Sequence, residues 1–223
     1  MAINHPGVGR RGGNALRPHF LEVKKSMAST TAPAVVPQSG AERASRSGIW
    51  VGIFAITMSF MAFSSALFVR QGSLDWGHLV LPPILYLNTL VLLASSGTFE
   101  LSRRHLEFHT AGRVGSSGSG VAWLLATLAL GIAFCAGQYA AWQNLRAQGI
   151  YLATNPNSSF FYVLTSIHVL HVTAGILAFV YLLGRLTIGS GLARRSFFDN
   201  TAIYWHFMGV LWLYLLMLCR IKL

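Results

Sequence analysis

Residues 159–175 read SFFYVLTSIHVLHVTAG, and the apolar run that they open continues without Asp, Glu, Lys or Arg to residue 184. A run of this length exceeds the roughly 20 residues with which an α-helix crosses a hydrocarbon core of about 30 Å. Within lipid, only helices and closed barrels satisfy every backbone polar group. Residues 159–184 are therefore predicted to form a transmembrane helix.

Four more segments are free of ionisable Asp, Glu, Lys and Arg side chains, namely 49–69, 79–99, 121–142 and 201–219. The composition agrees, since 53% of the 223 residues are hydrophobic and only 10% are charged, too few charges for an ordinary soluble surface. Pro82 and Pro83 fall in the first turns of the second span, where the missing N–H groups have no intrahelical partner in any case. The predicted fold is all-α, a polytopic membrane protein built as a bundle of five transmembrane helices.

Outside these spans the chain is polar. Residues 1–47 are basic and rich in Gly, Pro, Ser and Ala, so they are expected to be a cytoplasmic tail, largely extended or disordered unless partner subunits hold it. No signal-like apolar stretch precedes Ile49, and the first span is expected to act as its own insertion signal. Residues 48–223 form the predicted transmembrane domain. Within it, residues 112–120, GRVGSSGSG, are expected to be a flexible connection.

The basic residues predict the orientation. Thirteen Lys and Arg residues occur in the tail, the second gap and the fourth gap, whereas four occur on the other side: Arg70, Arg146, Arg220 and Lys222. By the positive-inside rule the N-terminus is cytoplasmic and the C-terminus is periplasmic or external. Because the basic residues lie in the gaps and form no single face, the net charge of +11 is interpreted as topology signals and headgroup contacts, and no nucleic-acid partner is expected.

Tryptophans and small residues are assigned packing and anchoring roles. The chain has six tryptophans, and most of them lie near predicted span ends, where indoles prefer the headgroup region. The six are Trp50, Trp76, Trp123, Trp142, Trp205 and Trp212. A stripe of small residues on the third span, which lets another helix approach closely, consists of Ala129, Ala133, Gly137 and Ala141. Cys135 and Cys219 are expected at different depths, which argues against a disulfide.

Polar side chains within the spans are the candidate functional residues, because each must find a partner in a medium without water. Asn88 and Gln138 are expected to bond between helices. His168 and His171 are three residues apart, so they lie about 60° apart on one helix face. One of them together with His206 could hold a haem, and all three could hold a metal ion. Histidines bonded between helices or to lipid headgroups are the favoured interpretation, since no carboxylate or thiol completes a site within any span.

A transport function is disfavoured, because ion pathways usually need an ionisable residue inside the membrane. Glu100 lies just past the second span. An interfacial ion pair with Arg103 or Arg104 accounts for it.

Several motifs in these spans resemble those of subunit III of haem-copper cytochrome c oxidases. The stretch from Ser159 to Gly175 resembles FFxLTxxHxxHVxxG, and Tyr204 to Phe207 with Trp212 resembles YWHFxxxxW. The other matches are Gly131, Phe134, Gln138 and Trp142 to LGxxFxxxQxxxW, and Asn88, Thr89, Ser95 and Ser96 to NTxxLLxSS. The resemblance covers about residues 47–220, in the short five-helix bacterial form.

The resemblance implies a non-catalytic subunit of a proton-pumping aerobic terminal oxidase in the bacterial inner membrane. Haem and copper then belong to partner subunits, and this chain holds no cofactor except bound phospholipids. The implied partners are catalytic subunit I, other oxidase subunits and membrane lipids, while membership of a respiratory supercomplex stays open. Expected lipid or interhelix polar contacts are Asn88, Glu100, Arg103, Gln138, Trp142, His168, His171, Trp205 and His206.

Two departures from the family pattern favour scaffold and lipid roles over proton handling. Ile56 stands where many members carry a glutamate, and Gly209 stands where an aspartate is common. The alternatives are the equivalent subunit of a quinol oxidase or a nitric oxide reductase and, from a different class, an independent haem-binding membrane protein.

Overall fold

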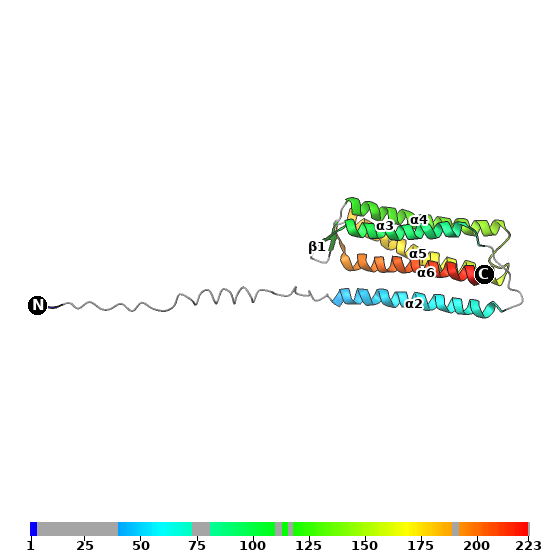
Figure 1. The fold of residues 1–223 in the computed structure, drawn as a ribbon, viewed down its shortest axis with the longest axis horizontal. Coiled ribbons are helices and arrows are strands. Elements are labelled where there is room, and N and C mark those ends of the chain that lie inside the picture. The colour runs from blue at the N-terminus through cyan, green and yellow to red at the C-terminus, as the bar shows by residue number, and fades with distance from the viewer. Residues whose placement is uncertain (4–39, 73–80, 110–112, 116–117, 189–191, 223) are drawn as a thin grey trace. The chain divides into compact units, whose positions relative to one another are not determined.

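The structure is a computed structural model that describes residues 1–3, 40–72, 81–109, 113–115, 118–188 and 192–222 (Figure 1). The chain divides into two units, Met1–Gln38 and Ser39–Leu223. All the helices and strands of the described residues belong to the second unit. Most of the predicted tail lies outside the described residues, but its last residues, 40–47, are helical.

Five long helices make up the second unit, each long and apolar enough to cross a membrane. They are α2 (Gly40–Arg70), α3 (Ile84–His105), α4 (Gly118–Ala147), α5 (Pro156–Thr187) and α6 (Arg195–Lys222). The prediction of an all-α membrane bundle is confirmed. Most of the helices extend beyond the uncharged runs, because polar residues at the membrane surface continue the helix after the hydrocarbon ends.

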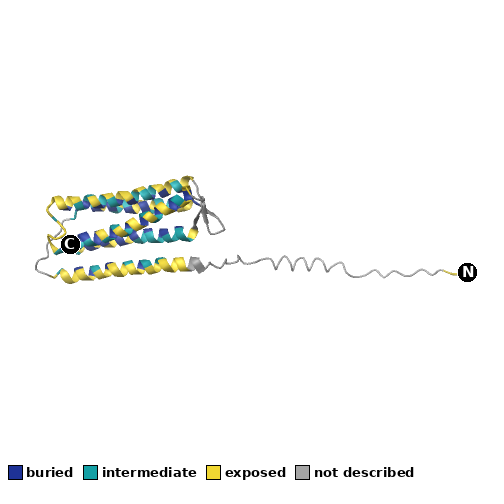
Figure 2. Ribbon diagram, turned by 180° about the vertical axis from the view of Figure 1, so that it is seen from behind, coloured by how far each residue is buried: buried dark blue, intermediate teal, exposed yellow. Residues whose placement is uncertain are grey.

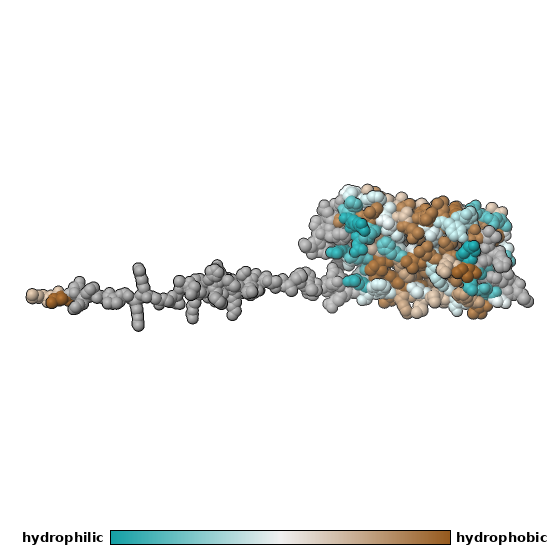
Figure 3. All heavy atoms as spheres, in the orientation of Figure 1, coloured by the Kyte–Doolittle hydropathy of each residue, from teal (hydrophilic) through white to brown (hydrophobic). Residues whose placement is uncertain are grey.

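The outer surface of the bundle is apolar. Hydrophobic residues gather over its middle in Figure 3, with hydrophilic residues toward both ends. Large side chains such as Leu87 and Leu177 are 60% and 63% exposed. In a water-soluble protein such a surface would aggregate, so it identifies the lipid-facing side of a multi-pass membrane protein.

The starts of two helices are fixed by prolines. Pro83 is the residue before α3, so this helix begins immediately after the proline pair, later than the predicted residue 79. Pro156 occupies the first turn of α5, and Asn155 and Ser158 form a reciprocal capping box there. Proline suits this position because it lacks the N–H that would remain unpaired.

Three short strands were not predicted. β1 (Glu107–His109), β2 (Arg113–Gly115) and β3 (Leu192–Arg194) form an antiparallel sheet in the order β1-β2-β3. The sheet joins the α3–α4 connection to the α5–α6 connection. Part of the expected flexible connection 112–120 is therefore a paired strand, and α4 already begins at Gly118. We call this end of the bundle the sheet end, and the opposite end, with Arg70 and Lys222, the far end.

Helix α2 is the most peripheral element. It packs mainly against α6 and α5. In its most apolar 18-residue stretch only 22% is buried inside the protein, against 44% in the corresponding stretch of α6. Figure 2 shows exposed residues along much of its length. The other four helices form the core in which most of the signature residues lie.

Candidate functional site

Trp205 of α6 lies at the centre of the four-helix core. Its indole Nε1 donates a hydrogen bond to Ser95 Oγ of α3 at 3.0 Å, and the residue is 1% exposed. A Cβ atom placed at Gly131 of α4 would lie 2.8 Å from this indole, and one at Gly175 of α5 would lie 3.0 Å from it. Both glycines thus provide the space that the indole occupies, and four helices meet at one side chain.

Trp212 makes a second contact of the same kind. Its Nε1 donates to Thr89 Oγ1 of α3 at 3.0 Å, and its ring packs edge-on against Phe134 at 5.0 Å. Trp205 and Trp212 are buried in the bundle, so the anchoring role predicted for most of the tryptophans does not extend to these two. The indole N–H groups of Trp205 and Trp212 are both hydrogen-bonded to hydroxyl groups of α3, so neither needs a partner at the membrane surface.

The remaining tryptophans differ among themselves. Trp50 and Trp123 are exposed, at 57% and 36%, and Trp76 lies outside the described residues. Trp142 of α4 is partly buried and donates from Nε1 to Thr165 Oγ1 of α5 at 3.1 Å. Tyr162 bonds beside it, since its hydroxyl donates to the backbone oxygen of Ile150 at 3.0 Å. These contacts link α4 to α5 near the far end.

His168 is fully buried between two aromatic rings. Its ring centroid lies 5.2 Å from that of Trp212 and 5.9 Å from that of Phe134. Gln138, on the helix that carries Phe134, is also fully buried. Neither polar side chain has a hydrogen-bond partner among the described residues.

His171 lies on a different face of α5. Its Nδ1 is 2.8 Å from the backbone oxygen of Ile167, and its ring centroid is 6.0 Å from that of Phe60 of α2. The hydroxyl of Tyr204 donates to the backbone oxygen of His171 at 2.9 Å. His171 therefore connects α5 to α2 and α6.

His206, Glu100 and Arg103 lie together near the sheet end of α3 and α6. The ring of His206 is 6.1 Å from that of Phe99, and it interacts electrostatically with Glu100 and Arg103. Glu100 forms ion pairs with Arg103 at 3.9 Å and with Arg104 at 4.0 Å, and all three side chains are well exposed. Ion pairs this exposed stabilise a helix only weakly.

Asn88 contacts α4 closely. Its amide donates to the backbone oxygen of Phe134 at 3.4 Å, and a Cβ at Gly137 would overlap the amide. Of the four residues in the predicted small-residue stripe, Gly137 and Ala141 are partly or fully buried in the bundle. Ala129 and Ala133 are exposed. A spacing of four residues drifts by about 40° per step on a helix of 3.6 residues per turn, so the stripe turns away from α3.

The histidines of the spans do not come together as a metal site in the part of the chain that the structure describes. Among the described residues, no group of three His, Cys, Asp or Glu side chains could share a metal ion. His168 is enclosed by aromatic rings, and His171 and His206 each have a different aromatic neighbour.

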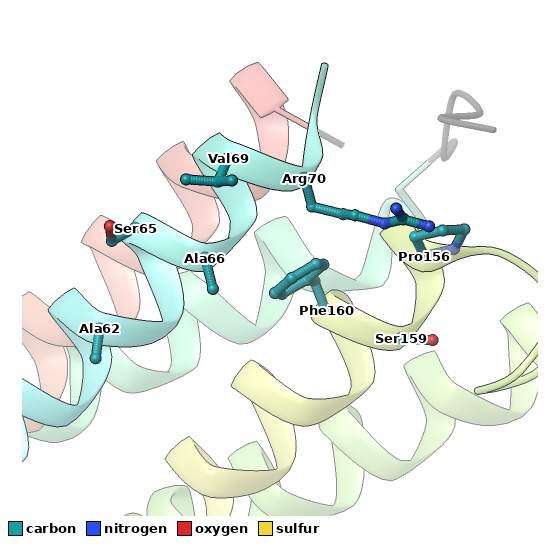
Figure 4. Close-up of a pocket in the computed structure, with 8 residues that line it drawn as sticks. All are labelled: Ala62, Ser65, Ala66, Val69, Arg70, Pro156, Ser159 and Phe160. Atoms are coloured by element: carbon teal, nitrogen blue, oxygen red, sulfur yellow. The ribbon is translucent and has the colours of Figure 1, made fainter. Parts of the chain in front are cut away.

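A groove of about 960 Å³ lies between α2 and α5, toward the far end; we call it the α2–α5 groove. Its lining residues are Ala62, Ser65, Ala66, Val69, Arg70, Pro156, Ser159 and Phe160. In Figure 4 the side chain of Arg70 reaches across toward Pro156, and the ring of Phe160 lies nearby. The groove therefore combines small and apolar walls with a cation at its end, next to the N-terminus of a helix.

Sequence reasoning did not identify this groove. The side chains of Ala62, Ser65 and Ala66 are not typical of a ligand-binding site. The one sequence feature that could indicate the groove is the recurrence of small residues on one face of α2. The sequence predicts only a topology role for Arg70. A second, smaller groove on the other side of α2 is lined in part by Tyr214, whose hydroxyl donates to Ser64 Oγ at 2.8 Å.

Comparison with known proteins agrees with these features. The family model for cytochrome c oxidase subunit III matches residues 46–221. A cytochrome c oxidase subunit 3 from Synechocystis is 32% identical over 77% of this chain and 69% of its own length. A quinol oxidase subunit 3 from Bacillus spizizenii is 30% identical over 80% of this chain and 87% of its own.

Other relatives match a shorter stretch. A probable cytochrome c oxidase subunit 3 from Mycobacterium leprae is 33% identical over 56% of this chain, and the match spans about three fifths of that relative, 59%. The family match covers all five membrane helices, including the helices that carry His168, Trp205 and Trp212. The chain belongs to the cytochrome c oxidase subunit III family of the haem-copper oxidases.

Proposed function

We propose that this chain is a non-catalytic subunit of a proton-pumping aerobic terminal oxidase, which stabilises catalytic subunit I and binds structural phospholipids. Oxygen reduction then takes place on haem and copper held by partner subunits. The observation that carries the proposal is that the signature side chains form helix–helix contacts. Trp205, Trp212 and Trp142 each use their indole N–H to join two helices.

The α2–α5 groove is the proposed lipid site. Acyl chains would lie along Ala62, Ala66 and Phe160, and the phosphate would lie at Arg70. A guanidinium bonds well to phosphate oxygens, and the positive end of the α5 dipole favours an anion at Pro156. The groove opens on the membrane-facing side of a peripheral helix, where lipid has direct access.

The proposed setting is a bacterial inner membrane, with the sheet end in the cytoplasm. The helix ends and connections at the sheet end carry five arginines, which are Arg103, Arg104, Arg185, Arg194 and Arg195. The far end carries fewer cations. This asymmetry is the pattern of the positive-inside rule. Arg70 would then meet headgroups of the outer leaflet.

Lipid binding is tested by native mass spectrometry of the complex purified in mild detergent. Arg70→Gln should reduce the number of anionic phospholipids retained, and Ala66→Phe should reduce it by filling the groove. Arg185→Gln, which removes the same charge at the other end of α5, is the matched control. Unchanged lipid retention in both groove variants would exclude this site.

The supporting role is tested on the oxidase purified with and without this chain. Both preparations should start with similar oxygen-consumption rates per haem, and the one lacking the chain should lose activity sooner during turnover. A visible spectrum of the isolated chain should show no Soret band. A tightly bound haem in the isolated chain would overturn the proposal.

A quinol oxidase is the second candidate complex. Relatives with the printed names quinol oxidase subunit 3 and cytochrome bo(3) ubiquinol oxidase subunit 3, the latter from Pseudomonas aeruginosa, match this chain at 30% identity. Identifying the subunits that copurify with the chain separates the two, because a cytochrome c oxidase retains a copper-containing electron-entry subunit and a quinol oxidase oxidises quinol directly.

A further inference from the structure

Gln138 of α4 and His168 of α5 lie at the same level of one helix interface. Phe134 contacts His168, and Trp142 bonds to Thr165, so two positions on α4 are tied to two positions on α5. Gln138 lies midway between Phe134 and Trp142, about 6 Å along the helix from each at 1.5 Å per residue. Because the two helices are antiparallel, Gln138 faces the stretch of α5 that carries His168.

Both side chains are enclosed without a partner. Each residue is 0% exposed, and four polar atoms have no hydrogen-bond partner among the described residues: Oε1 and Nε2 of Gln138, and Nδ1 and Nε2 of His168. Buried polar groups in folded proteins almost always find a partner, either in the protein or in ordered water. Two such groups on facing stretches of α4 and α5 point to a small hydrogen-bonding molecule as their partner.

We propose that Gln138 and His168 bind an internal water molecule that bridges α4 and α5. Water can donate to the amide oxygen and to the unprotonated ring nitrogen, and can accept from the amide or the imidazole N–H. An internal water typically makes about three such bonds. A neutral molecule suits the site, because no described Asp, Glu, Lys or Arg lies in the middle of these helices to balance an ion.

Trp212 of α6 lies next to His168, with 5.2 Å between the two ring centroids.

The direct test is a structure of the chain, with whichever subunits retain it, at a resolution that shows ordered water. We expect a water peak within hydrogen-bond distance of the Gln138 amide and one ring nitrogen of His168. In Gln138→Met, which keeps the length of the side chain and removes the amide, that peak should be lost. A direct Gln138–His168 hydrogen bond with no water, or an unchanged peak in Gln138→Met, would refute the proposal.

Radiolytic labelling gives a second test in the same preparation, because hydroxyl radicals formed from buried water oxidise adjacent side chains. His168 and Trp212 should be oxidised several-fold more than Trp205, although both tryptophans are 1% exposed. Labelling of His168 and Trp212 as low as that of Trp205 would mean that the interface is dry. Gln138→Met should reduce the labelling of Trp212 and leave that of Trp205 unchanged.

Discussion

Trp205 and Ser95 are 110 residues apart in the sequence, yet the indole Nε1 of Trp205 lies 3.0 Å from the hydroxyl oxygen of Ser95, inside the helix bundle. This bond joins α6 to α3, and the indole also fills the space next to two glycines.

Replacing Trp205 by Phe should destabilise the bundle by about 1–3 kcal/mol, because it removes a buried hydrogen bond and leaves a cavity. The measurement is the temperature at which the detergent-solubilised chain loses its monodisperse elution. Trp50→Phe is the control, since Trp50 is 57% exposed, and it should leave that temperature nearly unchanged. Equal effects of the two changes would contradict a central role for Trp205.

The glycines around Trp205 should not tolerate a methyl group. Gly175→Ala and Gly131→Ala place a Cβ at 3.0 Å and 2.8 Å from the indole, and overpacking of this kind costs about 1–3 kcal/mol. Gly97→Ala on α3 has nothing within 4 Å of its Cβ. That control should be neutral or stabilising by up to about 1 kcal/mol, and a thermal shift assay distinguishes the three variants.

His168→Ala and His171→Ala should weaken assembly of the complex without abolishing turnover. Each histidine packs against an aromatic side chain of another helix, His168 on Trp212 and His171 on Phe60. The yield of assembled oxidase should fall, while the rate per haem in the fraction that does assemble stays close to that of the wild type. Normal assembly with complete loss of electron transfer would contradict this assignment.

The Glu100 ion pairs should matter little. Their N–O distances are 3.9 and 4.0 Å, and the carboxylate side chain is 44% exposed, so Glu100→Gln should change stability by less than about 0.5 kcal/mol. Thermal denaturation of the variant at low and high salt checks this expectation. A larger loss that salt does not reduce would indicate a buried partner for Glu100.

The orientation is testable with single cysteines. Ala153→Cys, in the loop between α4 and α5, should react with a membrane-impermeant maleimide in intact cells. Arg104→Cys, whose position is 72% exposed at the sheet end, should react only after the membrane is opened. The reverse pattern would place the N-terminus outside. Unaltered protein provides the background, since Cys135 and Cys219 are partly or fully buried in the bundle.

The number and place of the membrane helices could be predicted because uncharged runs report directly on the hydrocarbon core. The family resemblance placed Trp205 among the expected lipid or interhelix contacts, but the predicted fifth span starts at residue 201 and puts this tryptophan near the end of the span. The helix in fact begins at Arg195, ten residues before Trp205. Its inward direction depends on Ser95, Gly131 and Gly175, which belong to three other helices.

The three strands and the α2–α5 groove also could not be predicted from the sequence. Strands of three residues contain too few positions for an alternating pattern, and β3 pairs with a segment far earlier in the chain. The groove arises between α2 and α5, because small side chains such as Ala62 and Ala66 leave space between the two helices. Such a property belongs to the arrangement of two helices and has no local signature.

The peripheral position of α2 has a consequence for biosynthesis. Among the five described membrane helices, α2 reaches the membrane before the others, yet its main packing partners, α5 and α6, reach it last. During translation, helix α2 must wait in lipid, and Ser64 cannot meet Tyr214 until the final helix has been inserted. Nascent chains arrested before α6 would therefore lack the larger part of the packing of α2, which is its contact with α6.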